Sequence, residues 1–213
     1  MNAEPDAAGF ILAGGRSTRM GRDKALLELG GQPLVTHALS ILRQAGLSAS
    51  IAGARADLVS YAPVVADAAP GLGPLSGICT ALASTSAQHA IFLPVDLPLI
   101  PSSLVAFLLF HARITGRTVT VPSLCGAAQT FPAVVNRAAL PALEDELAAG
   151  RRGCRSAFHA ASGREAVSAV AVELLVQVGQ AGDPRQLPSP WWFLNANTPE
   201  EIERILHIAR RIA

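Results

Sequence analysis

Short apolar runs alternate with helical patterns through the first 120 residues of this chain, and this alternation restricts the fold more than any other feature. The runs have the length of buried strands and fall at 9–13, 48–53, 63–66, 90–95 and 117–121. Segments with the period of a helix separate them, at 33–45, 56–61, 75–85 and 101–114. Alternation of this kind is typical of βαβ units. We therefore expect an α/β, three-layer, Rossmann-like fold, with a mainly parallel central sheet and helices on both faces.

The second half of the chain has a looser pattern, which predicts strands and helices added to the same sheet. Its candidate elements are a strand at 131–135, helices at 138–149 and 199–210, a short basic segment at 151–161, an apolar, β-prone and partly helical segment at 166–178, and a loop at 179–190. The last helix has a complete start signal, with Thr198 as N-cap, Pro199 as first helical residue and Glu201 as third. No linker or internal repeat divides the chain, so residues 1–213 are predicted to form a single domain.

Composition excludes several functional classes. Half of the 213 residues are apolar and 15% are charged, which excludes disorder for most of the chain. The 17 basic and 16 acidic residues give a net charge of +1, so nucleic acid is not an expected partner. The longest apolar run, 104–110, is too short to span a membrane, and the start of the chain does not resemble a secretion signal. Three widely spaced cysteines favour a reducing, cytoplasmic location, and the spacing of the five histidines argues against zinc.

The segment Leu12–Lys24, with the sequence LAGGRSTRMGRDK, is the strongest candidate for a functional site. Its glycine pair, Gly14 and Gly15, follows the first strand directly and lets the backbone approach a ligand without an intervening Cβ atom. Four cations follow closely: Arg16, Arg19, Arg22 and Lys24, the only lysine in the chain. Backbone N–H groups and clustered cations together suit a polyphosphate. The spacing matches neither the Walker A motif nor the dinucleotide fingerprint.

Two isolated carboxylates form a second candidate feature. Asp67 and Asp96 are the only acidic residues between Leu58 and Leu143, and each ends an apolar run. Open α/β sheets bind ligands at the carboxyl ends of their strands, so we expect both carboxylates at one edge of the sheet. The alternative, in which an aspartate caps the following helix, is common for a single residue. The presence of two such aspartates favours a functional role.

The loop and four further blocks resemble the nucleotidyltransferases of the glycosyltransferase-A-like fold, and most closely the molybdenum cofactor guanylyltransferases. The blocks are ELGGQPLVTHAL, DAAPGLGPLSGI, FLPVDLPLI and FLNANTPEEIERI, in the order in which that family has them. Together they span nearly the whole chain. The first loop alone would indicate only the superfamily, whereas the NANTPEE block makes the narrower resemblance specific.

The resemblance implies that the first loop binds a guanine nucleotide. The residues with backbone contacts to the nucleotide would be Leu12, Ala13 and Gly14. The residues that hold and neutralise its phosphates would be Gly15, Arg19 and Lys24. In the catalytic step, Arg19 and Lys24 would act together with Asp96.

The resemblance also implies a metal and an acceptor. Asp96 would bind Mg²⁺, Asp67 would belong to the nucleotide site, and Asn195 and Asn197 would lie near the metal or the pterin substrate. The implied reaction transfers GMP from GTP to the phosphate of molybdopterin and releases pyrophosphate. The implied setting is molybdenum cofactor biosynthesis in the cytoplasm, with transient contact to molybdoenzymes or their chaperones.

One departure from the family pattern leaves alternatives open. Many members have an asparagine in an ANR-like segment after the second strand, where this chain has Gly53-Ala54-Arg55. The missing amide puts the preference for GTP over CTP in doubt. A related transferase that uses CTP or a sugar phosphate is therefore an alternative, and a non-catalytic nucleotide-binding or delivery module is a second. A nicotinamide-dependent oxidoreductase is a distant third, because the glycine spacing does not fit.

Two further groups of side chains have a structural and a functional interpretation. The arginines at 151, 152 and 155 could meet the phosphate of the acceptor, but a solvated basic loop is the favoured interpretation. Trp191 and Trp192 could stack on a pterin, but packing in the core or at its edge is favoured.

Overall fold

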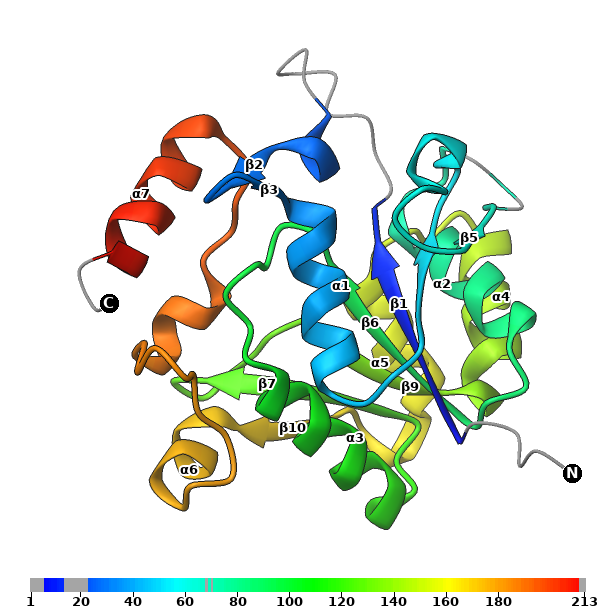
Figure 1. Ribbon diagram of the computed structural model, residues 1–213. Helices are drawn as coiled ribbons and strands as arrows, with labels where there is room; N and C mark the ends of the chain where they lie inside the picture. The colour runs from blue at the N-terminus through cyan, green and yellow to red at the C-terminus, as the bar shows by residue number, and fades with distance from the viewer. Residues whose placement is uncertain (1–5, 14–22, 68, 70, 211–213) are drawn as a thin grey trace, which may run out of the picture.

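A computed structural model describes residues 6–13, 23–67, 69 and 71–210 of the protein (Figure 1). Among these residues, one eight-stranded sheet has the order β10-β7-β9-β6-β1-β4-β5, with β8 paired to β7. The strands are β1 (Ala7–Leu12), β4 (Ala49–Ala52), β5 (Val64–Val65), β6 (His89–Pro94), β7 (Val119–Leu124), β8 (Ala127–Ala128), β9 (Ala133–Asn136) and β10 (Ser168–Ala171).

The sheet is mainly parallel, which confirms the expectation, and β1 has parallel neighbours on both sides. It pairs with β4 and with β6, so that Phe10 lies opposite Ser50 and Phe92. The exceptions are β9, which is antiparallel to both β6 and β7, and the short β8. The chain leaves β6 through the helix α3 (Ser102–Thr115) and enters β7, while β9 takes the place between those two strands.

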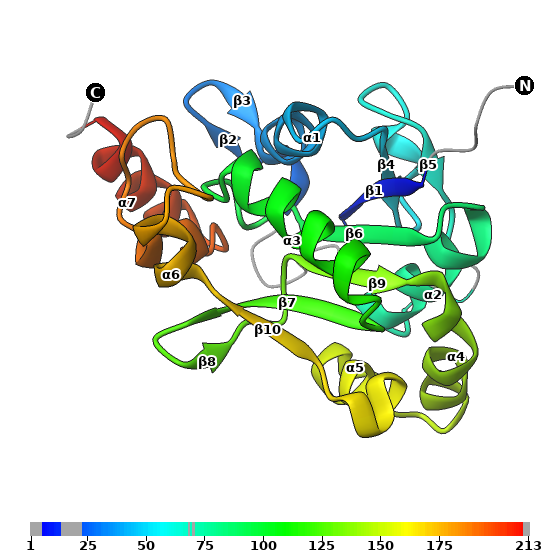
Figure 2. The same cartoon turned by 90° about the horizontal axis from the view of Figure 1, so that it is seen from below.

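Helices cover both faces of the sheet, so the three predicted layers are present (Figure 2). α1 (Leu34–Gln44) packs beside α3 on one face. The other face is covered by α2 (Pro74–Ser84), α4 (Leu140–Ala148) and α5 (Cys154–Ser162). α5 begins inside the segment 151–161, for which the sequence pattern indicated no helix, and ends one residue beyond it.

The strand residues divide between the two layers by simple alternation. Ile11 and Leu93 pack toward α1 and α3, whereas Phe10 and Phe92 pack toward α2. The rings of Phe10 and Phe92 are stacked with centroids 5.6 Å apart. Side chains of successive strand residues point to opposite faces, and near-continuous apolar runs are therefore what a sheet covered on both faces requires.

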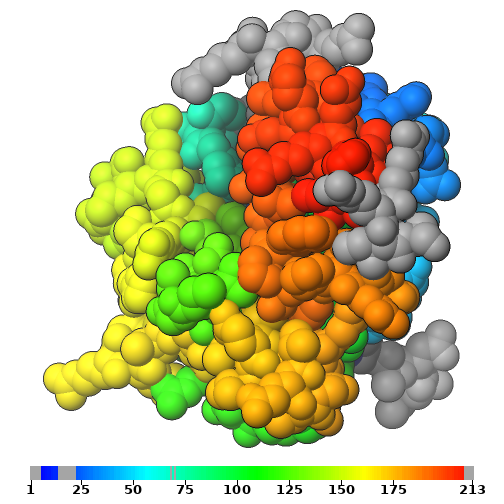
Figure 3. Space-filling view, turned by 90° about the vertical axis from the view of Figure 1, so that its left-hand side faces the viewer, coloured from blue at the N-terminus to red at the C-terminus, as the bar shows by residue number. Residues whose placement is uncertain are grey.

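The C-terminal elements form a column along one side of the molecule (Figure 3). They are α6 (Val172–Gln177), the 3₁₀ turn η5 (Ser189–Phe193) and α7 (Pro199–Arg210). Trp192 in η5 is 1% exposed, and its indole N–H donates to the carbonyl of Leu187 at 2.9 Å, so the favoured structural interpretation of this residue is confirmed. Trp191 is half-buried and packs against the same core.

Short elements complete the described part of the chain. The 3₁₀ turns are η1 (Lys24–Leu26), η2 (Ala56–Leu58), η3 (Arg137–Ala139) and η4 (Gly163–Glu165). β2 (Glu28–Leu29) and β3 (Gln32–Pro33) form a hairpin that the sequence analysis missed. Its turn residues Gly30 and Gly31 have φ values of +62° and +79°, which a two-residue hairpin turn requires and glycine adopts without strain. None of the helices described is long and apolar enough to cross a membrane.

Candidate active site

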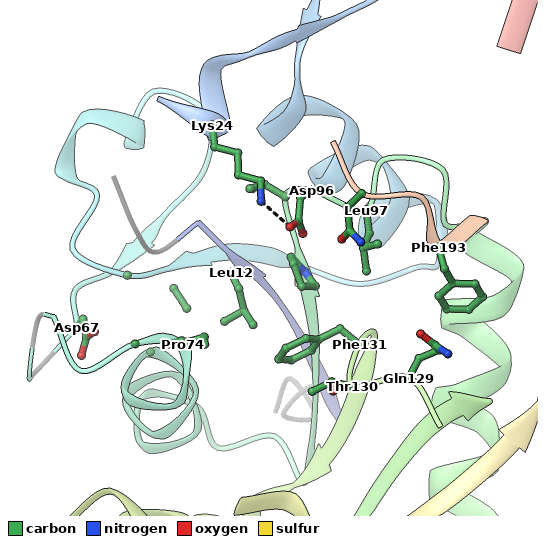
Figure 4. A pocket seen from close by; sticks show the side chains of 17 residues that line it. Leu12, Lys24, Asp67, Pro74, Asp96, Leu97, Gln129, Thr130, Phe131 and Phe193 are labelled. Carbon is green, nitrogen blue, oxygen red and sulfur yellow. Dashed lines mark hydrogen bonds and ion pairs between the residues drawn. The ribbon is translucent and has the colours of Figure 1, made fainter. Parts of the chain in front are cut away.

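A cavity of about 420 Å³ opens where β1, β4, β5 and β6 end (Figure 4). One end, called here the α2 end, is lined by Leu12, Ala52, Gly53, Asp67, Gly73, Pro74 and Gly77. The opposite end, called here the Phe193 end, is lined by Leu97, Gln129, Thr130, Phe131, Phe193 and Asn195. Lys24 and Asp96 point toward each other between the two ends.

Lys24 and Asp96 form the polar centre of the cavity, although 72 positions separate them in the sequence. The Lys24 ammonium Nζ lies 2.5 Å from Asp96 Oδ2. It also donates to Oδ1 of Asn197. The side chains of Lys24 and Asp96 are 22% and 20% exposed, so a ligand in the cavity can reach both. The structure thus brings together three of the residues selected from the sequence.

Asp96 is held by the elements on either side of it. It follows β6, and the N–H of the preceding Val95 donates to the carbonyl of Leu12 at 3.3 Å, which continues the pairing of β6 with β1. The carbonyl of Asp96 accepts the N–H of Ala196 at 2.9 Å. This hydrogen bond joins the C-terminal segment to the end of the central strand and places Asn195 and Asn197 on either side of the junction.

A capping box fixes the backbone beside Asn197. The N–H groups of Asn197 and Thr198 donate to Glu201 Oε2 at 2.6 and 3.1 Å, and the Glu201 N–H donates to Thr198 Oγ1 at 3.1 Å. The start of α7 is therefore the one predicted from the TPEE sequence. The capping box thereby fixes the backbone from which the Asn197 side-chain amide contacts Lys24.

Asp67 lies at the α2 end, two residues beyond β5. Its Oδ1 accepts the Ser76 hydroxyl at 2.5 Å and the Ala69 N–H at 3.0 Å. Ser76 is buried in the first turn of α2, where a carboxylate also interacts favourably with the helix dipole. Gly77, in the same helix, faces the backbone of Ala52, and a Cβ atom built on it would lie at an ordinary van der Waals distance of 4.0 Å from the Ala52 carbonyl. This contact sets α2 directly against β4.

Arg55 is a site-adjacent residue that the sequence analysis treated only as part of the departing Gly53-Ala54-Arg55 segment. Its guanidinium donates to the carbonyl of Ala13 at 3.1 Å, to both carboxylate oxygens of Asp57 at 2.8 and 3.0 Å, and to Asp23. The hydrogen bonds to Asp57 raise the pKa of Arg55 above its ordinary value, against the opposing effect of burial. No pattern in the sequence signalled this network, because two of its partners, Ala13 and Asp23, lie 42 and 32 positions away along the chain.

The remaining predicted residues have diverse locations. Leu12 lines the cavity, and Ala13 is buried with its carbonyl bonded to Arg55. Gly14, Gly15, Arg16, Arg19 and Arg22 lie outside the described residues. Arg151 forms an ion pair with Glu146 at 2.6 Å, and Arg152 is exposed. Arg155 is also exposed, but it belongs to α5 and not to a basic loop.

The residues at the centre of the cavity fit a divalent cation with oxygen ligands. Asp96 offers a carboxylate, Asn197 offers an amide oxygen that accepts from the same Lys24 ammonium, and Asn195 lines the same cavity. Mg²⁺ in phosphate-transfer sites commonly takes one or two carboxylates and completes its shell with substrate phosphates and water. Within the described residues, no group of three or more His, Cys, Asp or Glu side chains could hold a metal by itself. The donor set is consistent with a metal that binds together with its phosphate ligand.

A family model of NTP transferases matches residues 9–167, three quarters of the chain, which defines the class of protein as a nucleotidyltransferase. The protein resembles the crystal structure of molybdopterin-guanine dinucleotide biosynthesis protein A from Archaeoglobus fulgidus, with a TM-score of 0.76 over 96% of this chain and 99% of that one. The sequence identity is 20%, so this likeness shows the fold.

Sequence comparison identifies the family. The MobA-like NTP transferase domain matches residues 9–167, and the chain belongs to that family. A molybdenum cofactor guanylyltransferase from Rhizobium meliloti (strain 1021) is 35% identical over 218 aligned residues, which cover 96% of this chain and 94% of the relative. Another, from Xanthomonas euvesicatoria pv. vesicatoria (strain 85-10), is 42% identical over 103 residues, 47% of this chain and 52% of the relative. The resemblance found in the sequence is thereby confirmed.

Proposed function

We propose that the protein transfers GMP from GTP to the terminal phosphate of molybdopterin, with Mg²⁺ as cofactor and pyrophosphate as the second product. The observation that carries the proposal is the meeting of Lys24 and Asp96 in the middle of a cavity with two chemically different ends. Family membership and the names of the full-length relatives support the same substrates. The cytoplasm, where such a biosynthetic reaction would occur, is the proposed location.

The two ends of the cavity suit the two substrates. The α2 end has glycine backbone, the Asp67 carboxylate and the first turn of α2, whose free N–H groups favour anions. We assign the nucleotide to this end. The Phe193 end has two aromatic rings and two amide side chains, which suit a planar heterocycle with a hydrogen-bonding edge. We assign the pterin acceptor to this end, beside Asn195.

The reaction needs little covalent chemistry from the protein. An oxygen of the acceptor phosphate forms a bond to the α-phosphorus of GTP, while the bond from that phosphorus to the bridging oxygen of pyrophosphate breaks. The attacking phosphate is already an anion, so no general base is required. Lys24, with Arg19 from outside the described residues, would stabilise the negative charge that develops on pyrophosphate.

Asp96, with help from Asn195 and Asn197, would hold Mg²⁺ at the centre of the cavity. When bound, the metal supplies positive charge to the phosphates that the chain's own cations do not neutralise. The Glu201 carboxylate fixes the backbone of Asn197, and Asn197 in turn positions the Lys24 ammonium. The role of the protein is thus to orient two anions toward each other and to screen their repulsion.

The decisive experiment incubates the purified protein with Mg²⁺, molybdopterin and one nucleotide at a time, and identifies the product by mass. We expect a GMP adduct and pyrophosphate in the GTP reaction. If the CTP reaction gave a CMP adduct in higher yield than the GTP reaction gave a GMP adduct, the protein would be a cytidylyltransferase. This alternative is open because Gly53-Ala54 lacks the asparagine that many family members have. Transfer to a sugar phosphate, and not to molybdopterin, would show that the proposed acceptor is wrong. Tight GTP binding without pyrophosphate under any acceptor would indicate a non-catalytic delivery module.

Delivery of the product would require contact with other proteins. We propose transient contact with molybdoenzymes or their chaperones, because the product is a cofactor and not a free metabolite. Neither nucleic acid nor a membrane has a part in the proposed reaction.

A further inference from the structure

Arg55 joins the two described residues that border the segment 14–22. Its Nη1 donates to the carbonyl of Ala13, the residue after β1. Its Nη2 donates to the carboxylate of Asp23, the residue before η1. The side chain is 4% exposed, so these hydrogen bonds form largely out of water, where they are stronger than at the surface.

The contact with Asp23 leads directly to the centre of the cavity. Asp23 Oδ1 accepts the N–H of Ala25 at 3.0 Å, so Asp23 is the N-cap of the 3₁₀ turn η1. Lys24 is the first residue of that turn, and its ammonium lies against Asp96. Arg55 therefore holds the carboxylate of Asp23. Asp23 in turn holds the backbone of the turn that begins with Lys24. The same guanidinium also holds the carbonyl of Ala13, directly after β1.

Asp57 orients the guanidinium for this task. The Nε and Nη2 atoms of Arg55 form a two-point contact with the Asp57 carboxylate, at 3.0 and 2.8 Å. The planar fork is thereby aimed with Nη1 toward Ala13. A lysine has the charge but not the fork, and its single ammonium cannot address three acceptors in these directions. Two carboxylates and a carbonyl around one cation also account for the burial of a charged side chain.

We propose that Arg55 is a positioning residue of the proposed transfer reaction, which sets the place of Lys24 relative to the end of β1. This role rests on the proposed function, because Lys24 acts on the pyrophosphate part of the nucleotide only if a nucleoside triphosphate is the substrate. A shift of about 1 Å in a group that contacts the reacting phosphates can lower a rate about a hundredfold. Arg55 itself touches no substrate in this scheme and acts through Asp23 and Lys24.

The test compares the affinities of Arg55→Lys for GTP and GMP, each measured by calorimetry with Mg²⁺, together with kcat and KM. GMP lacks the two phosphates that Lys24 would contact. We expect GTP affinity to fall about tenfold or more, GMP affinity to stay within about twofold, and kcat to fall as well. The matched control is Arg185→Lys. Arg185 makes the same two-point contact with an acid two residues away, Asp183, but does not line the cavity.

Asp23→Asn supplies a second variant that leaves Arg55 in place. Asparagine keeps the capping group and removes the negative partner, so we expect the same selective loss of GTP affinity, smaller in size. A lower melting temperature with an unchanged ratio of GTP to GMP affinity in both variants would overturn the role, and so would an equal loss for both nucleotides. If the wild-type chain failed to bind GTP, the proposed nucleotide site would be wrong, and the proposed role of Arg55 would be wrong as a consequence.

Discussion

The substitution Lys24→Met is expected to have two effects of opposite sign. The ammonium lies 2.5 Å from Asp96 Oδ2, on the carboxylate assigned to Mg²⁺. Without nucleotide, Lys24 and a divalent cation would compete for that carboxylate. Methionine keeps much of the apolar stem and removes the charge. We therefore expect metal binding to the free protein to strengthen while turnover falls.

The geometry of the pair sets the size of the first effect. Two unit charges 2.5 Å apart attract by about 2 kcal/mol in bulk water and about 7 kcal/mol at an effective dielectric constant of 20. Desolvation and the ordering of a long side chain offset most of this attraction, and pairs near the surface typically contribute about 1 kcal/mol or less. A net 1 kcal/mol corresponds to about fivefold in affinity. We expect Lys24→Met to bind Mn²⁺ about fivefold more tightly than wild type when nucleotide is absent.

The second effect follows from the proposed role of Lys24 on the leaving group. Removing one preorganised donor to developing negative charge typically lowers the rate by about 10²–10³. Both quantities can be measured on one preparation, with Mn²⁺ binding followed by electron paramagnetic resonance and turnover by pyrophosphate release. Asp96→Asn is the matched control, because it weakens the metal ligand itself and should lower metal affinity and turnover together.

The reasoning would be refuted by a Lys24→Met protein that turns over normally. It would also be refuted if Mn²⁺ affinity without nucleotide fell in Lys24→Met as it does in Asp96→Asn. A misfolded variant loses both properties, so the opposite signs separate the electrostatic effect from structural damage.

Three further predictions concern stability, each measured by urea unfolding. Thr198→Ala removes one half of the capping box with Glu201 and should lower the free energy of unfolding by about 1 kcal/mol, while an unchanged value would mean that the box contributes nothing. Trp192→Phe leaves the Leu187 carbonyl without its indole donor and should cost about 1–3 kcal/mol. Burial lowers the pKa of His89, so the unfolded chain binds its proton more readily; stability should fall as the pH drops below about 6.5, and less steeply in His89→Leu.

Most secondary structure could be predicted because its signals are local. The helix expected at 33–45 is found at Leu34–Gln44, and the one expected at 199–210 begins and ends as expected. Apolar periodicity, proline in the first turn and the capping box all act within a few residues. The place of β9 could not be predicted, because strand order depends on pairings between distant segments, and β9 separates two strands joined by one helix.

The residues of the candidate site also fall into two groups, those with a local signal in the sequence and those that only the fold brings to the cavity. Asp67 and Asp96 could be selected because each is an isolated acid after an apolar run, and the structure places both in one cavity. Asn195 and Asn197 came from the resemblance alone. Gln129 and Phe131 carry no local signal of function, since they join the cavity only through the position of β8 and β9. The Arg55 contacts with Ala13 and Asp23 span 42 and 32 positions, which exceeds the range of any local pattern.

The topology explains why one cavity can have two different ends. From β1 the chain passes through α1 to β4, on one side, whereas from β6 it passes through α3 to β7, on the other. Connections that leave adjacent strands in opposite directions open a crevice at the carboxyl ends of those strands, where α/β proteins bind ligands. Asp96 follows β6 at this point and Leu12 ends β1 beside it. Elements on the β4 side can therefore serve one substrate, and elements on the β7–β9 side the other, with the Lys24–Asp96 pair at the boundary where a phosphate from each would meet.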